Sequence, residues 1–206
     1  MVSLRFAAAM VAFAATVMAH VSESEIRRAV PKPLALMQSS SLQWLEKNTC
    51  TSCHHQILPA IAFDLARRHG VELDADKLQR TASRSLDIFA DPDTAIQGWL
   101  IGESVNIIYR LVAEEPLGIP RTAATGAYAR LAARRQLADG HWEKDDYRPL
   151  QASSTFSTTA YSLQTLQLFL PKQMELERKR RVERATAWLE KTSARDTEDY
   201  VYQLPA

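Results

Sequence analysis

Apolar residues recur along this chain at spacings of three and four positions, and no stretch alternates apolar and polar residues over the length of a strand. Such spacings place side chains on one face of an α-helix. The first of these stretches runs from about residue 33 to 48, with candidate core positions at Leu34, Met37, Leu42 and Leu45. The pattern therefore predicts an all-α protein.

A second helix is expected from about residue 58 to 69, with candidate core positions at Ile61, Leu65 and Ala66. Gly70 would end it, because glycine tolerates the left-handed conformation that closes many helices. Further helices are expected at about residues 75–89, 102–114, 120–137, 155–169 and 172–191. Proline, glycine and aspartate mark their boundaries, and Ser153, Ser154 and Thr155 are expected to cap the helix that contains Phe156.

The predicted helices follow one another in pairs, and one tetrapeptide recurs. The segment 44–47, Trp-Leu-Glu-Lys, recurs at 188–191. The separation between the two segments corresponds to about three periods of about 48 residues. This spacing predicts antiparallel helix pairs that stack as repeats into an arc. The segment 197–204 resembles the start of a further element that is cut short, so the C-terminal edge is either incomplete or covered by a second copy or a partner.

The first nineteen residues have the features of a secretory signal peptide. Arg5 gives a positive start, residues 6–18 form an uncharged apolar run, and Ala19 offers a small residue for cleavage. An apolar run of about 13 residues is shorter than the about 20 needed to span a bilayer. We therefore expect a signal peptide at 1–19, a linker at 20–32, one repeat domain at 33–206 without an integral membrane span, and a periplasmic or secreted location.

The overall charge excludes one class of partner. The 206 residues contain 25 lysines and arginines against 24 acidic residues. No global positive field would recruit nucleic acid or an anionic membrane surface. The basic cluster at 178–184 is interleaved with glutamates at helical spacing, which is typical of a solvated helix face.

The strongest chemical signal is the pentapeptide 50–54, Cys-Thr-Ser-Cys-His, which contains both cysteines of the chain. This is the C-x-x-C-H pattern of covalent haem attachment. The thiols of Cys50 and Cys53 would add to the two vinyl groups of haem c, and His54 would be the proximal ligand of the iron. Export supports this interpretation, because bacteria attach haem covalently outside the cytoplasm.

Two other interpretations of the cysteine pair remain open. The thiols could form a disulfide or a free dithiol, or they could supply part of a divalent metal site. A closed zinc site is short of ligands, since the chain has no second C-x-x-C and no H-x-x-x-H pair. A thioredoxin-like site is disfavoured, because no strand feeds a helix near Cys50.

The sixth ligand of a bound haem iron has three candidates: His141, Met37 and Met174. His55 follows His54 directly and cannot readily reach the opposite face of the same iron. The methionines are the only two outside the signal peptide, and methionine in a helix is more often core than ligand. A five-coordinate iron is therefore an alternative.

The segment Gln136–Trp142 resembles the Gln-Trp motif of the squalene–hopene cyclase and prenyltransferase superfamily, whose domains are α/α toroids. The resemblance implies a partial α/α toroid, since this chain has fewer helix pairs than a complete one. Locally, Asp139 and Gly140 would make a tight turn, Gln136 would bond exposed backbone groups, and Trp142 would cover helix ends. The segment 50–56 also resembles a Cys-x-x-Cys-His-His-Gln segment in bacterial exported toroid-like repeat proteins.

The departures from this superfamily bear on activity. Its cyclases protonate their substrate with an Asp-x-Asp-Asp motif, and neither 91–94 nor 145–146 contains that pattern. We therefore expect no terpene cyclisation and no catalytic residues. The leading prediction is an electron-transfer protein with a redox partner; the alternative is a toroid module that binds an apolar ligand or a protein and joins Cys50 to Cys53 in a disulfide.

Overall fold

The computed structural model describes residues 21–48, 52–86, 93, 104–144 and 154–203, and every regular element in these ranges is helical. The predicted all-α class is confirmed. The α-helices are α2 (Glu23–Ala29), α3 (Pro31–Lys47), α4 (Leu58–Arg68), α5 (Ala75–Leu86), α7 (Ser104–Glu114), α8 (Ala123–Arg134), α9 (Thr155–Phe169), α10 (Glu175–Lys191) and α11 (Thr197–Gln203). Three short turns complete the described elements: the π-helical η1 (Cys53–Ile57) and the 3-10 helices η3 (Glu115–Leu117) and η4 (Lys172–Met174).

The helix ends agree with local capping chemistry. Helix α9 begins after Ser154, whose side chain accepts a hydrogen bond from the backbone of Ser157, so the predicted capping role is confirmed for Ser154. Helix α8 begins three residues later than predicted, because Thr122 forms the capping box. Residues 23–29, predicted to be linker, form α2 behind a capping box of Ser22 and Glu25.

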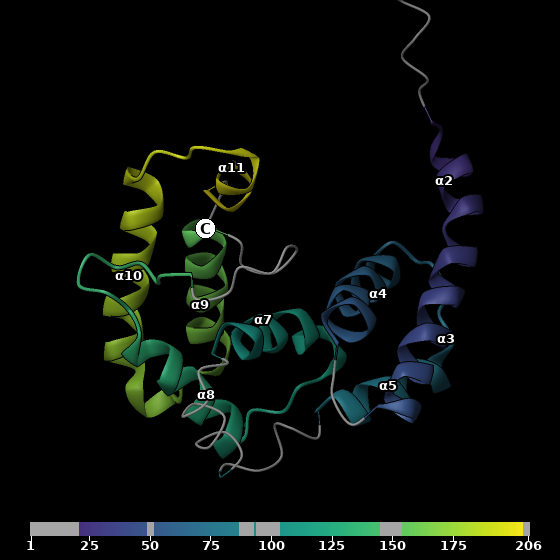
Figure 1. The fold of residues 1–206 in the computed structure, drawn as a ribbon, viewed down its shortest axis with the longest axis horizontal. Helices are drawn as coiled ribbons and strands as arrows, with labels where there is room; N and C mark the ends of the chain where they lie inside the picture. Colours follow the sequence, from purple (N-terminus) through teal and green to yellow (C-terminus); the bar gives the residue numbers. More distant parts are fainter. Residues whose placement is uncertain (1–20, 49–51, 87–92, 94–103, 145–153, 204–206) are drawn as a thin grey trace, which may run out of the picture.

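Helix α7 lies between two groups of helices, with α2 to α5 on one side and α8 to α11 on the other (Figure 1). It contacts η1 and α4 in the first group and α8 and α9 in the second. Both members of an ion pair on this helix, Arg110 and Glu114, are almost fully buried, with 3.4 Å between Nη2 and Oε2. A buried charge is costly without its partner, so this pair makes the helix intolerant of change at either position.

The larger hydrophobic core surrounds α9, which contacts α7, α8, α10 and α11. Its fully buried members include Leu111, Ala129, Leu166 and Ala185. Each of these residues comes from a different helix, so the core holds the four helices α7 to α10 together.

A second, smaller core forms where α3 and α4 meet, from Leu34, Phe63 and Ala66. The prediction that Ile61 and Leu65 are core residues is wrong, because their side chains are 40% and 56% exposed. Helix α4 packs instead through the face that carries Phe63 and Ala66, and Ile61 and Leu65 lie outside that face.

Helices α3 and α5 run parallel to each other. Hydrogen bonds pair the first half of α3 with the start of α5 and the residue before it, Gln38 with Asp74 and Ser39 with Lys77. The last turns of α3 pair with later residues of α5, Glu46 with Arg80 and Leu45 with Arg84. The C-terminal ends of α3 and α5 therefore lie next to each other. Stacked antiparallel pairs require this orientation of alternate helices.

The two helices that carry the repeated tetrapeptide correspond in length and in register. Both α3 and α10 have 17 residues, and both end on the lysine of Trp-Leu-Glu-Lys. In each, the backbone N–H of the residue after that lysine donates to the tryptophan carbonyl at 2.9 Å. Leu45 and Leu189 are both buried. This match supports the predicted repeat, whose extension to the intervening helices stays a prediction.

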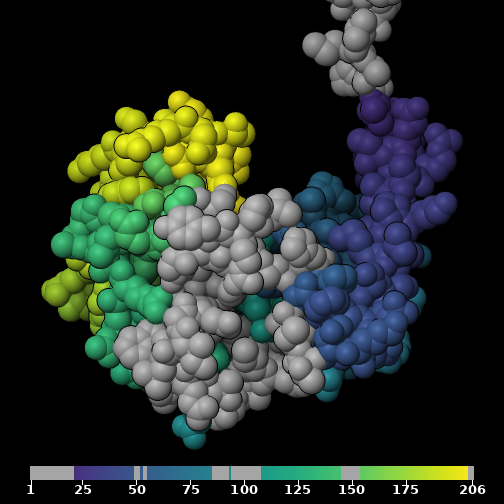
Figure 2. Space-filling model, in the orientation of Figure 1, coloured from purple at the N-terminus to yellow at the C-terminus, as the bar shows by residue number. Residues whose placement is uncertain are grey.

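The outline of the molecule is hollowed between α11 and the helices α2 to α4 (Figure 2). Exposed apolar side chains occur in both halves of the sequence, at Ile61 and Leu65 on α4 and at Tyr200 and Val201 on α11. Among the described helices, none combines the length and the apolar character that crossing a membrane requires.

Burial predicts opposite outcomes for two leucine substitutions. Leu166→Ala removes a side chain with no exposed surface from the core around α9, and we expect it to lower the free energy of unfolding by about 2–5 kcal/mol. The control Leu65→Ala changes an exposed position, and its effect should stay within about 0.5 kcal/mol. Denaturant unfolding followed by circular dichroism measures both; equal losses would contradict the described packing of α4.

Candidate functional site

The C-x-x-C-H segment joins α3 to α4. Cys50, one of the two predicted attachment residues, lies outside the described residues. Cys53 and His54 have a described backbone, and their side chains lie outside the description. Both belong to η1, which continues into α4 without a break. The second half of the motif is therefore part of a helical turn.

Hydrogen bonds join this turn to α3. The Gln56 side chain is 2% exposed, and its Oε1 accepts from the backbone N–H of Ser52 at 2.6 Å. Its Nε2 donates to the carbonyl oxygen of Ser41, in the middle of α3, at 3.0 Å. A single side chain thus satisfies one backbone group inside the C-x-x-C spacer and one on the neighbouring helix.

A stacked pair of rings holds the same turn from another side. The rings of His55 and Trp44 have centroids 4.5 Å apart and planes 12° apart. Nδ1 of His55 lies 3.1 Å from the Ser52 hydroxyl oxygen, within hydrogen-bond distance. Ring stacking and the hydroxyl contact fix His55 against α3 and, through it, the spacer residue Ser52.

The end of η1 is buried in the core. Ile57 is 1% exposed and packs with Tyr109 and Ala113 of α7. Tyr109 meets Tyr161 of α9 edge to face, and the hydroxyl of Tyr161 lies 2.9 Å from that of Tyr202. Burial and then the hydrogen bond with Tyr202 raise the pKa of Tyr161 far above its ordinary value, so this phenol stays protonated.

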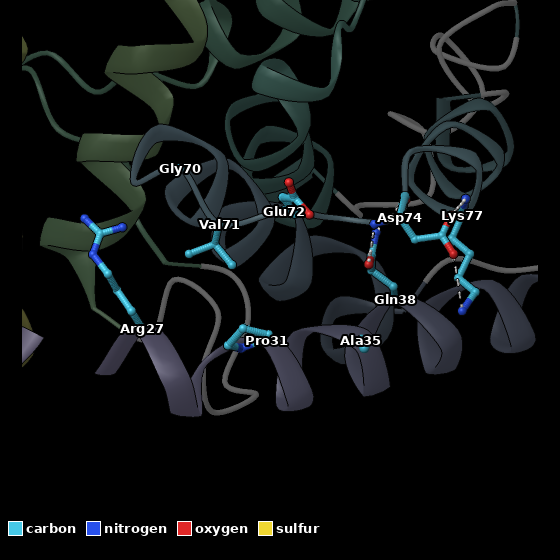
Figure 3. Close-up of a pocket in the computed structure, with 9 residues that line it drawn as sticks. All are labelled: Arg27, Pro31, Ala35, Gln38, Gly70, Val71, Glu72, Asp74 and Lys77. Carbon is cyan, nitrogen blue, oxygen red and sulfur yellow. Dashed lines mark hydrogen bonds and ion pairs between the residues drawn. The ribbon is translucent and has the colours of Figure 1, made fainter. Parts of the chain in front are cut away.

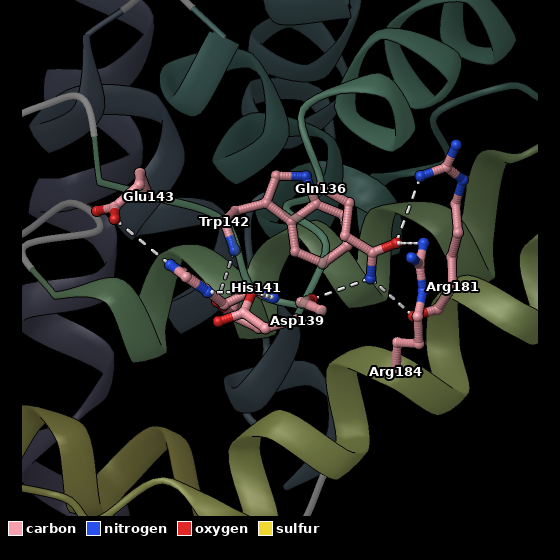
Figure 4. A network of polar contacts seen from close by, with 9 residues as sticks. Gln136, Asp139, His141, Trp142, Glu143, Arg181 and Arg184 are labelled. Atoms are coloured by element: carbon pink, nitrogen blue, oxygen red, sulfur yellow. Dashed lines mark hydrogen bonds and ion pairs between the residues drawn. The ribbon is translucent and has the colours of Figure 1, made fainter.

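The Gln136–Trp142 segment forms a second loop anchored on a helix, here α10 (Figure 4). Nε2 of Gln136 donates to the carbonyl oxygens of Gly140 and Arg181 at 2.9 and 2.8 Å. Oε1 accepts from Arg184 at 2.8 Å and from Arg181 at 3.3 Å. The predicted role of Gln136, to bond exposed backbone groups of this turn, is confirmed, and it extends to α10.

Two further residues of this segment behave as predicted. Gly140 has φ +112°, and an added Cβ would lie 2.3 Å from the carbonyl oxygen of Arg184, so no other residue fits this turn. Trp142 is 2% exposed; its indole N–H donates to the carbonyl oxygen of Ala132 in the last turn of α8 at 2.7 Å. Trp142 thus covers a helix end.

His141 stacks on Trp188 of α10, with ring centroids 4.9 Å apart and planes 23° apart. Its ring nitrogens face two carboxylates, with Nδ1 2.7 Å from Asp139 Oδ1 and Nε2 3.4 Å from Glu143 Oε1. Desolvation raises the pKa of Asp139, but hydrogen bonds from the His141 ring and backbone outweigh it, so the pKa of Asp139 is lowered.

The three residues predicted as alternatives for a sixth ligand all have packing or polar contacts in this fold. Both ring nitrogens of His141 lie near carboxylates. Met37 is half-buried against the small core of α3 and α4, and Met174 packs against the core around α9. Among the described residues, no three histidine, cysteine, aspartate or glutamate side chains come together as a metal site.

A cavity of about 490 Å³ lies between α3 and the segment 70–74 (Figure 3). Gln38 crosses it, donating to the carbonyl oxygen of Asp74 and accepting from the Asp74 backbone N–H. The Asp74 carboxylate accepts from the backbone of Lys77, and this bond lowers the pKa of Asp74. These polar groups join α3 to the segment 70–74, so they serve the packing of the two.

Sequence reasoning missed the two histidine–tryptophan stacks. The tetrapeptide repeat drew attention to Trp44 and Trp188, and the histidines His55 and His141 both stand in or beside the segments identified as motifs. The available signal was a histidine in or directly beside each of the two segments, at His55 and His141. What the sequence could not provide was the packing that brings each histidine onto its tryptophan.

The close approach at Gly140 predicts a large effect of an added methyl group. Gly140→Ala strains a left-handed backbone and also drives Cβ into the Arg184 carbonyl oxygen. The control Gly118→Ala has φ +94° and open space around the new atom, so it adds backbone strain alone. We expect Gly140→Ala to lose about 1–3 kcal/mol more than the control in denaturant unfolding. Similar losses for the two would show that the loop does not press on α10.

The lowered pKa of Asp139 predicts a dependence of stability on pH. Stabilisation by this carboxylate is fully present above its ordinary pKa of 3.8 and is lost as the pH falls through the lowered pKa in the folded protein. The thermal midpoint of Asp139→Asn should therefore lie below that of the wild type by a constant amount between about pH 4 and 6. The difference should shrink below that range; a difference that grows in acid would contradict the described contact.

Compared with protein-family models, curated proteins and solved structures, the chain has no match. Its resemblance to the toroid superfamily therefore stays a prediction from the residues that carry it, chiefly 136–142. Any function has to be proposed from the chemistry of its own side chains and from their surroundings.

Proposed function

We propose that this chain is an exported protein that carries haem c, covalently bound through Cys50 and Cys53, and that transfers electrons to or from a redox partner protein. One observation carries the proposal: the only two cysteines of the chain form a C-x-x-C-H motif with His54. The signal-peptide-like residues 1–19 support a periplasmic or secreted location for this proposal.

The donor set fits the group. In each attachment a thiol adds across a vinyl group: a carbon–sulfur bond forms, the thiol hydrogen ends on the other vinyl carbon, and no oxidant is needed. The imidazole of His54 is a nitrogen donor of the kind that binds haem iron. Bound haem would supply a one-electron redox centre. The chain's own contribution is a turn, residues 52–57, that is tied to α3 and buried at Ile57.

The three candidates for a further iron ligand already have contacts in the described fold. His141 would have to leave its carboxylate neighbours and Trp188, and Met174 would have to leave the core around α9. Met37 would have to leave the core of Leu34 and Phe63. Each exchange would sacrifice packing that the fold already uses. A sixth ligand from these three residues would therefore require a rearrangement of the described packing.

A second candidate function is favoured by the exposed apolar side chains. Ile61 and Leu65 on α4 and Tyr200 and Val201 on α11 would suit a non-catalytic repeat module that binds an apolar ligand or a protein, or that self-associates. In that case a disulfide between Cys50 and Cys53 would close the loop. The two candidates differ in the covalent state of the cysteines.

The mass and visible spectrum of the exported mature protein distinguish them. We expect co-expression with the haem-attachment machinery to add the mass of one haem, and the absorption bands to persist after denaturation in acid and organic solvent. Cys53→Ser should prevent the doubly attached form. A colourless product that lacks two hydrogens relative to the dithiol would support the disulfide and overturn the haem proposal.

A further inference from the structure

We infer that Gln56 and His55 are positioning residues that hold Ser52, the spacer residue next to Cys53, against α3 before any cofactor is attached. The inference rests on the proposed function for its biological meaning, while its geometry depends only on described residues. Both side chains act on Ser52, which separates the two cysteines together with Thr51. Gln56 holds its backbone N–H at 2.6 Å, and His55 lies 3.1 Å from its hydroxyl.

The anchor continues from Ser52 into α3. Gln56 donates to the Ser41 carbonyl oxygen at 3.0 Å, and the His55 ring stacks on Trp44. Ser41 itself is fully buried, so water does not compete for this carbonyl group. Ser52 is thus connected, through Gln56 and His55, to the middle and to the last turn of α3.

Fixing the backbone of Ser52 and Cys53 lowers the conformational cost of joining the two thiols. Ser52 and Cys53 are two of the four residues from the first cysteine to the second, and both are held, one by Gln56 and one by the η1 turn. Fewer backbone conformations are then lost when the thiols are joined, whether by two thioethers or by a disulfide. Loss of the anchor should therefore disfavour both closed states.

The chain provides its own control at the other end of the fold. Gln136 binds the Arg181 carbonyl oxygen of α10, and His141 stacks on Trp188 in the same way as His55 stacks on Trp44. This second loop, 135–144, contains no cysteine. A substitution there should cost comparable stability without touching the thiols.

The test compares Gln56→Met with Gln136→Met, which remove the polar contacts and keep side-chain size nearly constant. In the cofactor-free protein, we expect Gln56→Met to make a Cys50–Cys53 disulfide about tenfold easier to reduce, a shift of about 30 mV for a two-electron couple. Gln136→Met should leave that potential unchanged although it also lowers the thermal midpoint. Equal potentials in the two variants and the wild type would overturn the inference.

Haem loading separates this inference from the proposed function. A wild type that takes up no haem while Gln56→Met still shifts the thiol potential leaves the positioning role standing and removes the haem proposal. If the wild type loads haem while Gln56→Met leaves both the thiol potential and the loading unchanged, the haem proposal stands and the positioning role is overturned. Where Gln56→Met does not fold, Ser52→Ala removes only the hydroxyl contact with His55 and should shift the potential in the same direction by a smaller factor.

Discussion

Backbone groups at the ends of helices and in the loops between them need partners once they are buried, and glutamine side chains provide these partners at four places in the described chain. Each amide spans two segments: Gln38 bonds Asp74, Gln56 bonds Ser41 and Ser52, Gln136 bonds Gly140 and Arg181, and Gln203 bonds Leu189 and Thr192. An amide can donate and accept at once, which a hydroxyl of shorter reach could not do across these distances. These four side chains thus join irregular segments and helix ends to neighbouring helices.

The same combination of a glutamine side chain and a histidine–tryptophan stack holds two loops of different chemical character. At one end of the chain a glutamine and a histidine–tryptophan stack hold a loop with two cysteines; at the other end they hold a loop with none. The helices underneath, α3 and α10, have equal length and end alike. The same kind of anchoring therefore occurs at two places in the described fold, and only one of the two loops contains cysteines.

Local signals in the sequence were sufficient for most of the described helices and for the turn at Gly140, because periodicity, caps and glycine act over a few residues, but they missed α2. They failed on α4, where apolar residues occupy two faces and only packing selects the face with Phe63 over that with Leu65. The anchoring of Ser52 by Gln56 was also beyond reach, since it depends on α3 lying beneath the turn. The roles of the Cys53 and His54 side chains remain predictions from the motif.

The contact between Gly140 and the Arg184 carbonyl oxygen leaves no room for even a methyl group. The distance between this loop and α10 is therefore set by the radii of backbone atoms, and it cannot be adjusted by exchanging one side chain for another of different size. Most helix contacts drift as their side chains change in the course of evolution. The contact at Gly140 is fixed by backbone atoms, so the separation of α10 from the loop that contains Gly140 should survive extensive substitution elsewhere in the core.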